Sequence, residues 1–171
     1  MHNHGLGAWT SKRRLKTPDR PALVFDGREI TYRQFADAVD NMSALLWQRG
    51  IRKSDRVAFL GENCPEFLDV LFGCAQLGAV FVPINTRLAA PEVDHVLRDS
   101  GARVLIHDPE FAGEVAGIVD RVGITHVIQT GEHTSEGARG LAAALREGRS
   151  GHTDVEVTLD DPAAIVYTSG T

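Results

Sequence analysis

Residues 55–84, DRVAFLGENCPEFLDVLFGCAQLGAVFVPI, decide the fold class of this chain. Two short apolar runs rich in β-forming residues, 55–61 and 79–84, enclose a segment with Pro65 near its start and Gly78 at its end. Proline in the first turn and glycine just past the last turn are typical of a helix. A strand, a helix and a second strand in this order predict two parallel strands joined by a right-handed crossover.

The helix predicted within this stretch is apolar around most of its circumference. Its main apolar stripe consists of Phe67, Leu68, Leu71, Phe72 and Ala75. Three further apolar residues lie off this stripe: Val70, Cys74 and Leu77. A helix with apolar residues on several faces is typical of a buried position, so we expect this one to be covered on more than one side. Asn63 is its predicted N-cap.

A hairpin and a long helix are predicted upstream of this unit. Asp26-Gly27 separates the β-rich runs 22–25 and 29–31 and is the strongest hairpin signal in the chain. Thr31 follows as the predicted N-cap of a helix, and Gln34 stands three residues later, as in a capping box. Apolar residues then recur at helical spacing.

Downstream of residue 84 the alternation of helix and strand continues. We expect, in order, a helix over 91–100, a strand over 102–108, a helix over 109–121 and a strand over 125–130. The composition changes over 130–153, where we expect a surface excursion around one short helical patch, 138–148. A last strand is expected over 163–167. The pattern predicts an α/β fold with a mostly parallel sheet and helices on both faces.

Composition indicates a globular protein of one domain. The chain has 171 residues, of which 43% are hydrophobic and 24% charged, and its formal charge is −5. This length is sufficient to bury a core. The charges form no basic stripe, so nucleic-acid binding is not expected, and no window has the apolar length of a transmembrane segment. Residues 1–20 contain a basic cluster without an apolar signal region and are expected to be a solvated, partly ordered lead-in.

Two cysteines, Cys64 and Cys74, fall in the same predicted helix. Ten helical residues would separate them by roughly 15 Å, which is beyond the reach of a disulfide. Reduced thiols that act as small core residues fit a protein of the cytoplasm. We therefore expect a cytoplasmic location.

The histidines have ordinary structural interpretations. His2 and His4 stand on the predicted lead-in without an accompanying cluster of acids or cysteines. We therefore predict no metal site there. His107 and His126 fall in predicted strands or at their ends, where we expect structural histidines.

Two polar loops are ambiguous from the sequence. Asp160-Asp161 precedes Pro162 and predicts a turn rather than a pair of catalytic carboxylates. Asn85, Thr86 and Arg87 follow a predicted strand. They form either a structural cap or, through the guanidinium of Arg87, part of a ligand site.

The last residues, AAIVYTSGT, combine a short apolar run with small hydroxyl and glycine residues. They are predicted to sit at the carboxyl end of a strand, which is where open α/β sheets bind ligands. Gly170 allows the backbone to approach an anion closely, and Thr168, Ser169 and Thr171 supply hydroxyl donors beside backbone N–H groups. The segment lacks the spacing of a Walker A loop. Its composition alone leaves a phosphate site and an ordinary turn both open.

DDPAAIVYTSGT, residues 160–171, resembles the start of the phosphate-binding signature of the AMP-forming adenylating enzymes, the family of acyl-CoA synthetases, luciferases and peptide-synthetase adenylation domains. In that family the loop continues as Thr-Gly-x-Pro-Lys-Gly. Residues 18–51, 55–88 and 99–108 are similar to successive N-terminal segments of fatty-acyl-CoA synthetases. GAVFVPINTRL, residues 78–88, is typical of the acyl-CoA synthetase branch.

The resemblance implies a two-step ligase. A carboxylic acid, expected to be a fatty acid, attacks the α-phosphate of ATP with Mg²⁺ to give an acyl-adenylate and pyrophosphate, and coenzyme A then displaces AMP. By the same resemblance Thr168, Ser169, Gly170 and Thr171 bind the β- and γ-phosphates of ATP. Residues 21–171 then correspond to the N-terminal α/β subdomain of an AMP-binding domain that is truncated within its phosphate loop.

The resemblance also implies that several functional residues and motifs of the family are absent from these 171 residues. The family's loop lysine, its adenine and ribose motifs, its metal-coordinating acid and the lysine of its C-terminal domain have no counterpart here. We therefore assign no catalytic residue and expect the chain alone to be inactive, with exposed core surface that favours self-association. Two alternatives remain: a non-catalytic nucleotide- or phosphate-binding module of the same fold, and a partner-interaction fragment.

Overall fold

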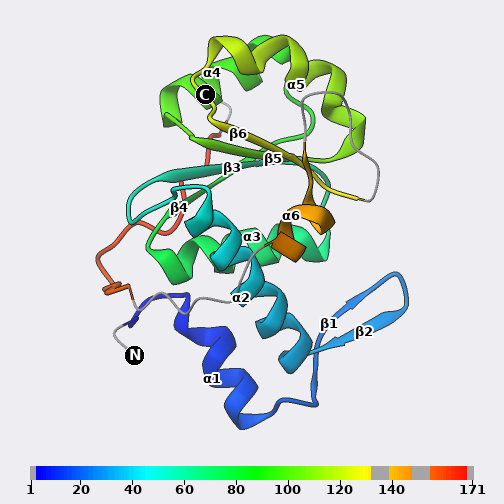
Figure 1. The fold of residues 1–171 in the computed structure, drawn as a ribbon, viewed down its shortest axis with the longest axis vertical. Coiled ribbons are helices and arrows are strands. Elements are labelled where there is room, and N and C mark those ends of the chain that lie inside the picture. The colour runs from blue at the N-terminus through cyan, green and yellow to red at the C-terminus, as the bar shows by residue number, and fades with distance from the viewer. Residues whose placement is uncertain (1–2, 132–138, 148–154, 169–171) are drawn as a thin grey trace.

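The computed structural model describes residues 3–131, 139–147 and 155–168 (Figure 1). Its central strands are β3 (Arg56–Leu60), β4 (Val80–Ile84), β5 (Val104–His107), β6 (His126–Gln129) and β7 (Arg139–Gly140). They form one parallel sheet in the order β4-β3-β5-β6-β7. The helices that cover it are α2 (Tyr32–Gln48), α3 (Pro65–Leu77), α4 (Ala90–Ser100), α5 (Ala112–Ile118) and α6 (Leu141–Glu147).

The order of the strands follows from helices that cross on opposite faces. α3 connects β3 to β4 on one face of the sheet, and α4 then returns over the other face to β5 (Figure 1). As a result β3 lies between its two successors, with Ala58 paired to Val82 on one side and to Leu105 on the other. The predicted α/β fold, with a parallel sheet and helices on both faces, is confirmed.

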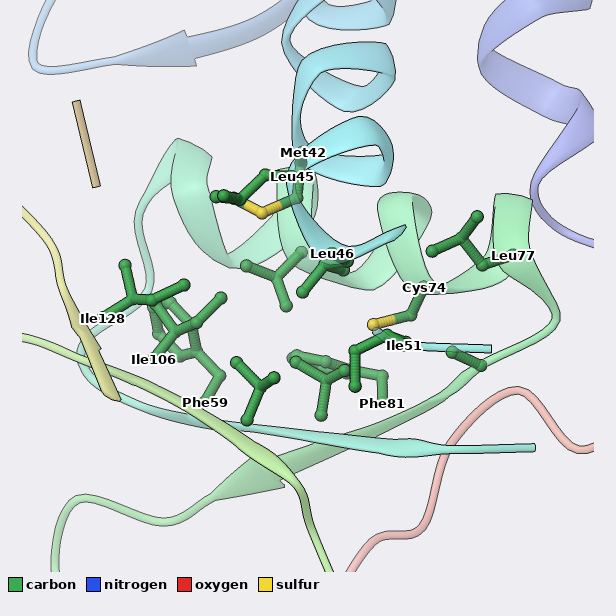
Figure 2. Close-up of a cluster of buried hydrophobic side chains, with 14 of the residues drawn as sticks. Met42, Leu45, Leu46, Ile51, Phe59, Cys74, Leu77, Phe81, Ile106 and Ile128 are labelled. Atoms are coloured by element: carbon green, nitrogen blue, oxygen red, sulfur yellow. The ribbon is translucent and has the colours of Figure 1, made fainter. Parts of the chain in front are cut away.

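Alternate side chains of β3 contribute to two hydrophobic clusters. Phe59 points toward α2 and α3, into a cluster that we call the α2–α3 cluster (Figure 2). This cluster includes Met42, Leu46, Phe59, Cys74, Phe81 and Ile106. Ala58 and Leu60 point the other way, into the α4–α5 cluster, which includes Ala58, Leu60, Val82, Val96, Leu97 and Ile118. The central strand is therefore buried on both faces, as its continuous apolar run requires.

α3 is covered on more than one side, as predicted, but its most buried face differs from the predicted stripe. Val70, Cys74 and Leu77 are fully buried, whereas Phe67 and Leu71 are only partly buried. The side chains off the predicted stripe belong to the α2–α3 cluster. The helix begins at Pro65 with Cys64 in the N-cap position, so the prediction of Asn63 as N-cap is wrong by one residue.

The predicted hairpin and capping box are both confirmed. β1 (Pro21–Phe25) and β2 (Arg28–Thr31) pair antiparallel as a separate two-stranded sheet. Asp26 and Gly27 between them have φ values of 48° and 73°, as a type I′ turn requires. At the start of α2, the N–H of Gln34 donates to Oγ1 of Thr31 at 3.3 Å, and the N–H of Thr31 donates to Oε1 of Gln34 at 2.9 Å.

The predicted lead-in, residues 1–20, is folded over much of its described part. It contains helix α1 (Ala8–Lys16), in which Ala8, Thr10 and Ser11 are buried. A Cβ at Gly7 would lie 2.5 Å from the carbonyl oxygen of Ala75, so the segment before α1 lies against the backbone of α3. The segment is therefore partly ordered, as expected, but it is not solvated throughout, because small residues allow close packing. The domain boundary at residue 21 stays a prediction.

Two downstream predictions need correction. The helix expected over 109–121 is divided into the 3₁₀ turn Pro109–Phe111, α5, and the 3₁₀ turn Val119–Arg121. The short helical patch expected over 138–148 is confirmed as α6. The surface position expected for it is wrong, because β7 extends the sheet and Leu141 and Ala144 of α6 are buried in the α2–α3 cluster. The rest of that prediction, 132–138 and 148–154, lies outside the described residues.

Candidate functional site

The loops after β3 and β5 meet at the carboxyl edge of the sheet. The chain leaves β3 toward α3 on one face and leaves β5 toward α5 on the other. Such a reversal is the topological switch point at which open α/β sheets bind ligands. Asp108, the first residue after β5, lies at this point.

The carboxylate of Asp108 accepts hydrogen bonds from the loops on both sides. Its Oδ2 accepts from the N–H of Glu62 at 2.8 Å, and its Oδ1 accepts from the hydroxyl of Thr130. The N–H of Asp108 itself donates to the carbonyl oxygen of Leu60 at 2.9 Å. Glu62 in turn accepts from the hydroxyl of Thr86 at 3.4 Å. One chain of hydrogen bonds thus connects the ends of β6, β5, β3 and β4.

Gly61 lies against this carboxylate, and we expect Gly61→Ala to destabilise the chain by about 1–3 kcal/mol. A Cβ on residue 61 would lie 2.6 Å from Cγ of Asp108, so the carboxylate has to leave its hydrogen bonds. Urea unfolding followed by circular dichroism measures the change. The matched control is Gly113→Ala, because a Cβ there would have no atom within 4 Å other than its chain neighbours and the backbone of its own helix. Equal effects of the two substitutions would contradict the close packing of Gly61 on Asp108.

His107 has a structural partner at this edge. Its side chain is 1% exposed, and its Nδ1 lies 2.8 Å from the carbonyl oxygen of Asp108. Burial lowers the pKa of His107, although the contact with Asp108 opposes this change. Burial likewise lowers the pKa of His126 in β6. The ring of His107 is therefore neutral near pH 7 and acts as a structural histidine, as predicted.

Asn85 forms a cap after β4. Its Oδ1 accepts from the N–H of Arg87 at 3.0 Å, and its carbonyl oxygen accepts from the N–H of Leu88 at 3.1 Å. These contacts are those of a local turn. They support the first of the two interpretations of this loop, the structural cap.

The predicted last strand, 163–167, does not form as a regular strand. The N–H of Phe81 donates to the carbonyl oxygen of Ala163 at 3.0 Å, and the N–H of Ile165 donates to the carbonyl oxygen of Phe81 at 2.9 Å. Only a single parallel bridge, between Phe81 and Ala164, results along the free edge of β4 (Figure 1). The next ladder donor would be Pro83, which has no N–H, so the pairing stops.

The predicted phosphate segment is described only at its first residue. Thr168 is exposed, whereas Ser169, Gly170 and Thr171 lie outside the described residues. Over residues 3–131, 139–147 and 155–168, no hydrogen bond joins Thr168 to the loops around Asp108. The preceding residue, Tyr167, instead donates its hydroxyl to Asp99 of α4 at 2.7 Å. Within these ranges, Thr168 and the switch point are therefore not joined by a hydrogen bond.

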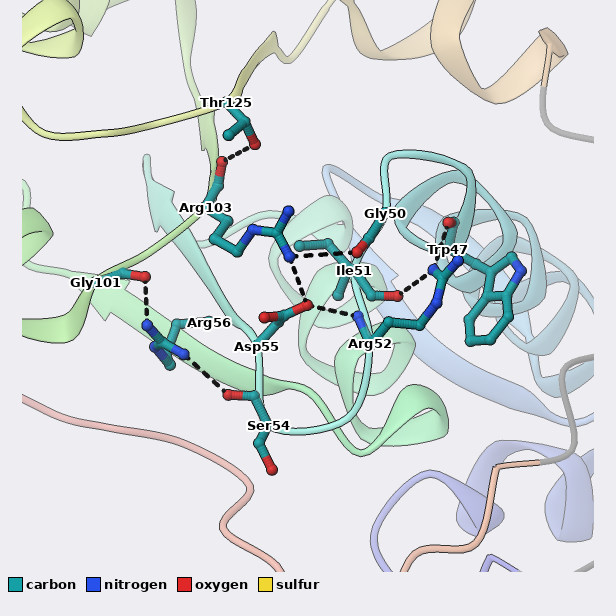
Figure 3. A network of polar contacts seen from close by, with 10 residues as sticks. All are labelled: Trp47, Gly50, Ile51, Arg52, Ser54, Asp55, Arg56, Gly101, Arg103 and Thr125. Atoms are coloured by element: carbon teal, nitrogen blue, oxygen red, sulfur yellow. Dashed lines mark hydrogen bonds and ion pairs between the residues drawn. The ribbon is translucent and has the colours of Figure 1, made fainter.

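Charged groups at the opposite, amino edge of the sheet bind one another. Arg103 forms an ion pair with Asp55 at 3.1 Å, and Asp55 also accepts from the N–H of Arg52 at 2.8 Å (Figure 3). Arg56 donates to the carbonyl oxygen of Gly101 at 2.7 Å. These residues fix the loops before the strands, so this network is structural.

Asp161 likewise has a structural role, which confirms the predicted turn. Its Oδ2 accepts from the N–H of Thr158 and from Nζ of Lys53, both at 2.7 Å. The hydrogen bond with Lys53, followed by that with Thr158, lowers the pKa of Asp161. The carboxylate is therefore an acceptor that closes a turn.

The two thiols of the described part of the chain are protonated. Burial raises the pKa of Cys64 to about 12 and also raises that of Cys74, so both remain protonated thiols. Both cysteines are free, in agreement with the predicted distance between them. No group of three His, Cys, Asp or Glu residues is placed to hold a metal ion within the described ranges.

Asp108 and Asp99 were not singled out from the sequence. Asp108 carries one usable signal, because it is an acid directly after a predicted strand, where carboxyl-edge ligand sites form. The sequence gives no such signal for Asp99, since its hydrogen-bond partner Tyr167 lies 68 residues away. Both contacts depend on how the elements pack.

Three comparisons with known proteins agree. A sequence profile of the family described as AMP-binding enzyme matches residues 11–171. Feruloyl-CoA synthase of an Amycolatopsis species is 42% identical over 99% of this chain and 32% of its own length. The long-chain-fatty-acid–CoA ligase FadD13 of Mycobacterium tuberculosis is 38% identical over 97% of this chain and 33% of its own length.

The solved structure of the anthranilate CoA ligase AuaEII in complex with anthranoyl-AMP matches with a TM-score of 0.92. The two are 27% identical, and the match covers 99% of this chain and 33% of that structure. The chain thus spans about a third of the length of the relatives that it matches.

Proposed function

The chain belongs to the family of AMP-binding enzymes, and from this membership we propose that it is the N-terminal portion of an AMP-forming acid–thiol ligase. In this proposal the parent protein converts a carboxylic acid and ATP to an acyl-adenylate and pyrophosphate. It then transfers the acyl group to coenzyme A and releases AMP. The observation that carries the proposal is the family match over residues 11–171.

Thr168, Ser169, Gly170 and Thr171 are the proposed ligands of the β- and γ-phosphates of ATP. Their hydroxyl and backbone N–H donors suit a phosphate. Support also comes from the exposure of Thr168. Donors held in place stabilise the charge that develops in the transition state, so the contribution of this segment is positional and electrostatic. We assign no catalytic residue to the chain.

Mg²⁺ is proposed only for the parent protein. Mg²⁺ in nucleotide sites is usually bound through one or two carboxylates together with phosphate oxygens. The part of the chain that the structure describes has no three-residue cluster suited to a metal. We therefore assign none of its residues to the ion, whose chemistry in such a site is to neutralise phosphate charge.

The acid is proposed to be a fatty acid, with an aromatic acrylic acid as the second candidate. FadD13 acts on long-chain fatty acids by its name, and the feruloyl-CoA synthase, which is named for an aromatic acid, shares the higher identity of 42%. Formation of acyl-CoA from palmitate and from ferulate by the parent protein, measured by mass spectrometry, decides between them. Formation of neither product would contradict both assignments.

A cytoplasmic location is also a proposal. Across the described ranges, none of the helices combines the length and apolarity of a membrane span. Self-association through exposed apolar side chains, such as Leu159 at 84% exposure, stays a prediction that sedimentation velocity can test. A monodisperse monomer at all concentrations would contradict it.

The reading frame of the encoding DNA separates the ligase from its two rivals. If Thr-Gly-x-Pro-Lys-Gly follows Thr171 in frame, the chain is part of a complete phosphate loop. A stop codon at that point would instead favour a non-catalytic nucleotide-binding module or a partner-interaction fragment. Binding of ATP to the isolated chain without turnover would then distinguish those two.

A further inference from the structure

The last turn of α4 carries an acidic side chain that the proposed function does not use. Asp99 is the penultimate residue of α4, and Gly101 follows the helix as its C-cap with a left-handed φ of 61°. The carbonyl oxygens of Ser100 and Gly101 accept from the guanidinium of Arg56 at 2.6 and 2.7 Å. This end of the helix is therefore held against the start of β3.

A hydrogen-bond donor stabilises the carboxylate of Asp99 at this position. A carboxylate in the last turn of a helix is disfavoured by the helix dipole, which places partial negative charge at that end. The hydroxyl of Tyr167 donates to Oδ2 of Asp99 at 2.7 Å. Burial, and then the hydrogen bond with Asp99, raises the pKa of Tyr167 to about 12, so the hydroxyl stays protonated at neutral pH. Tyr167 is thus a permanent hydrogen-bond donor to Asp99 at neutral pH.

Tyr167 is the last of several anchors on the segment that leads to Thr168. Backbone hydrogen bonds attach Ala163 and Ile165 to Phe81 of β4. Ile165 and Tyr167 also pack against the α4–α5 cluster, while Val166 between them is 67% exposed. The backbone is therefore attached to the sheet and to α4 up to the residue before Thr168.

We propose that the hydrogen bond between Tyr167 and Asp99 positions Thr168, the first residue of the proposed phosphate segment, for the phosphates of ATP. The inference rests on the proposed function of that segment. Tyr167 is a positioning residue, because its hydroxyl is occupied by Asp99 and acts on ATP only through the backbone that follows. A displacement of about 1 Å in groups that orient a substrate is enough to reduce its turnover strongly.

The test uses the parent protein with Tyr167→Phe and Asp99→Asn. We expect Tyr167→Phe to raise KM for ATP about tenfold, as loss of one hydrogen bond to a charged group does. KM for the carboxylic acid is expected to stay unchanged. The double variant is expected to show no more than the effect of Tyr167→Phe, because both changes remove the same contact.

Tyr32→Phe is the matched control, since Tyr32 starts α2 and its ring faces Arg13 rather than α4. A contact with only a structural role would lower stability and the fraction of active enzyme, and would leave KM for ATP unchanged. That result in Tyr167→Phe, with an active wild-type enzyme, overturns the inference alone. A wild-type parent without acid-dependent consumption of ATP overturns the proposed function, and with it the role of the contact in ATP binding.

Discussion

Removal of the hydroxyl groups of Thr168 and Ser169 from the parent protein is expected to lower kcat/KM for ATP by about 10²–10³. Donors that are held in place before the reaction stabilise the charge of the transferred phosphates at no cost of reorganisation. The pair Thr168→Val and Ser169→Ala removes two such donors and keeps the size of the side chains. Steady-state release of pyrophosphate at varied ATP concentration measures the loss.

Thr125→Val is the control for this substitution. The hydroxyl of Thr125 donates to the carbonyl oxygen of Arg103 at 2.9 Å, at the amino edge of the sheet. This variant is expected to lose about 1 kcal/mol of stability and to keep its kcat/KM for ATP. An equal loss of kcat/KM in the control, or none in the Thr168 and Ser169 variant, would contradict the assignment of the phosphate segment.

Phe59→Ala is expected to lower the free energy of unfolding by about 3–5 kcal/mol. Phe59 lies in the central strand, is fully buried, and meets the ring of Phe67 edge to face at a centroid distance of 5.4 Å. Its removal leaves a cavity between the sheet and α3 that neighbouring side chains fill only in part. Since single domains are stable by about 5–15 kcal/mol, much of the folded population is lost on mild heating. Urea unfolding measures the change.

Leu15→Ala provides the comparison for the core substitution. Leu15 lies on α1 and is 79% exposed, so its removal is expected to change the free energy of unfolding by less than about 0.5 kcal/mol. A similar loss in both variants would contradict the packing of β3 between two hydrophobic clusters.

The elements that the sequence predicts well are those with local signals. The turn at Asp26-Gly27 and the reciprocal contacts of Thr31 and Gln34 involve residues at most three apart. Gly101 ends α4 because its left-handed conformation suits glycine. Such features depend on neighbours in the chain, and so they can be inferred without knowledge of the packing.

The errors concern segments whose structure depends on distant partners. α1 is held on α2 by the ion pairs of Arg14 with Asp37 and Asp40. α6 is held by burial of Leu141 and Ala144 in the α2–α3 cluster. The pairing of residues 163–167 is limited by Pro83 on the neighbouring strand. None of these determinants lies within the segment that it controls, so propensity and periodicity could not identify them.

The candidate site likewise has one part that the sequence could predict and one part that it could not. The hydroxyl-rich segment from Thr168 could be proposed from composition and resemblance, because its chemistry lies in consecutive residues. The bonds of Asp108 to Glu62 and Thr130 unite three loops, and the bond of Tyr167 to Asp99 unites the segment with a helix. These connections become visible only when the strand order is known.

Carboxylate-dependent exchange of labelled pyrophosphate into ATP tests the central claim most directly, because it requires reversible formation of an acyl-adenylate. The parent protein is expected to catalyse this exchange only when ATP, Mg²⁺ and a suitable carboxylic acid are all present, and the isolated chain of 171 residues is expected to show none. Exchange by the isolated chain would contradict its assignment as an incomplete part of the ligase. Absence of exchange by the parent with every acid tested would contradict the ligase itself.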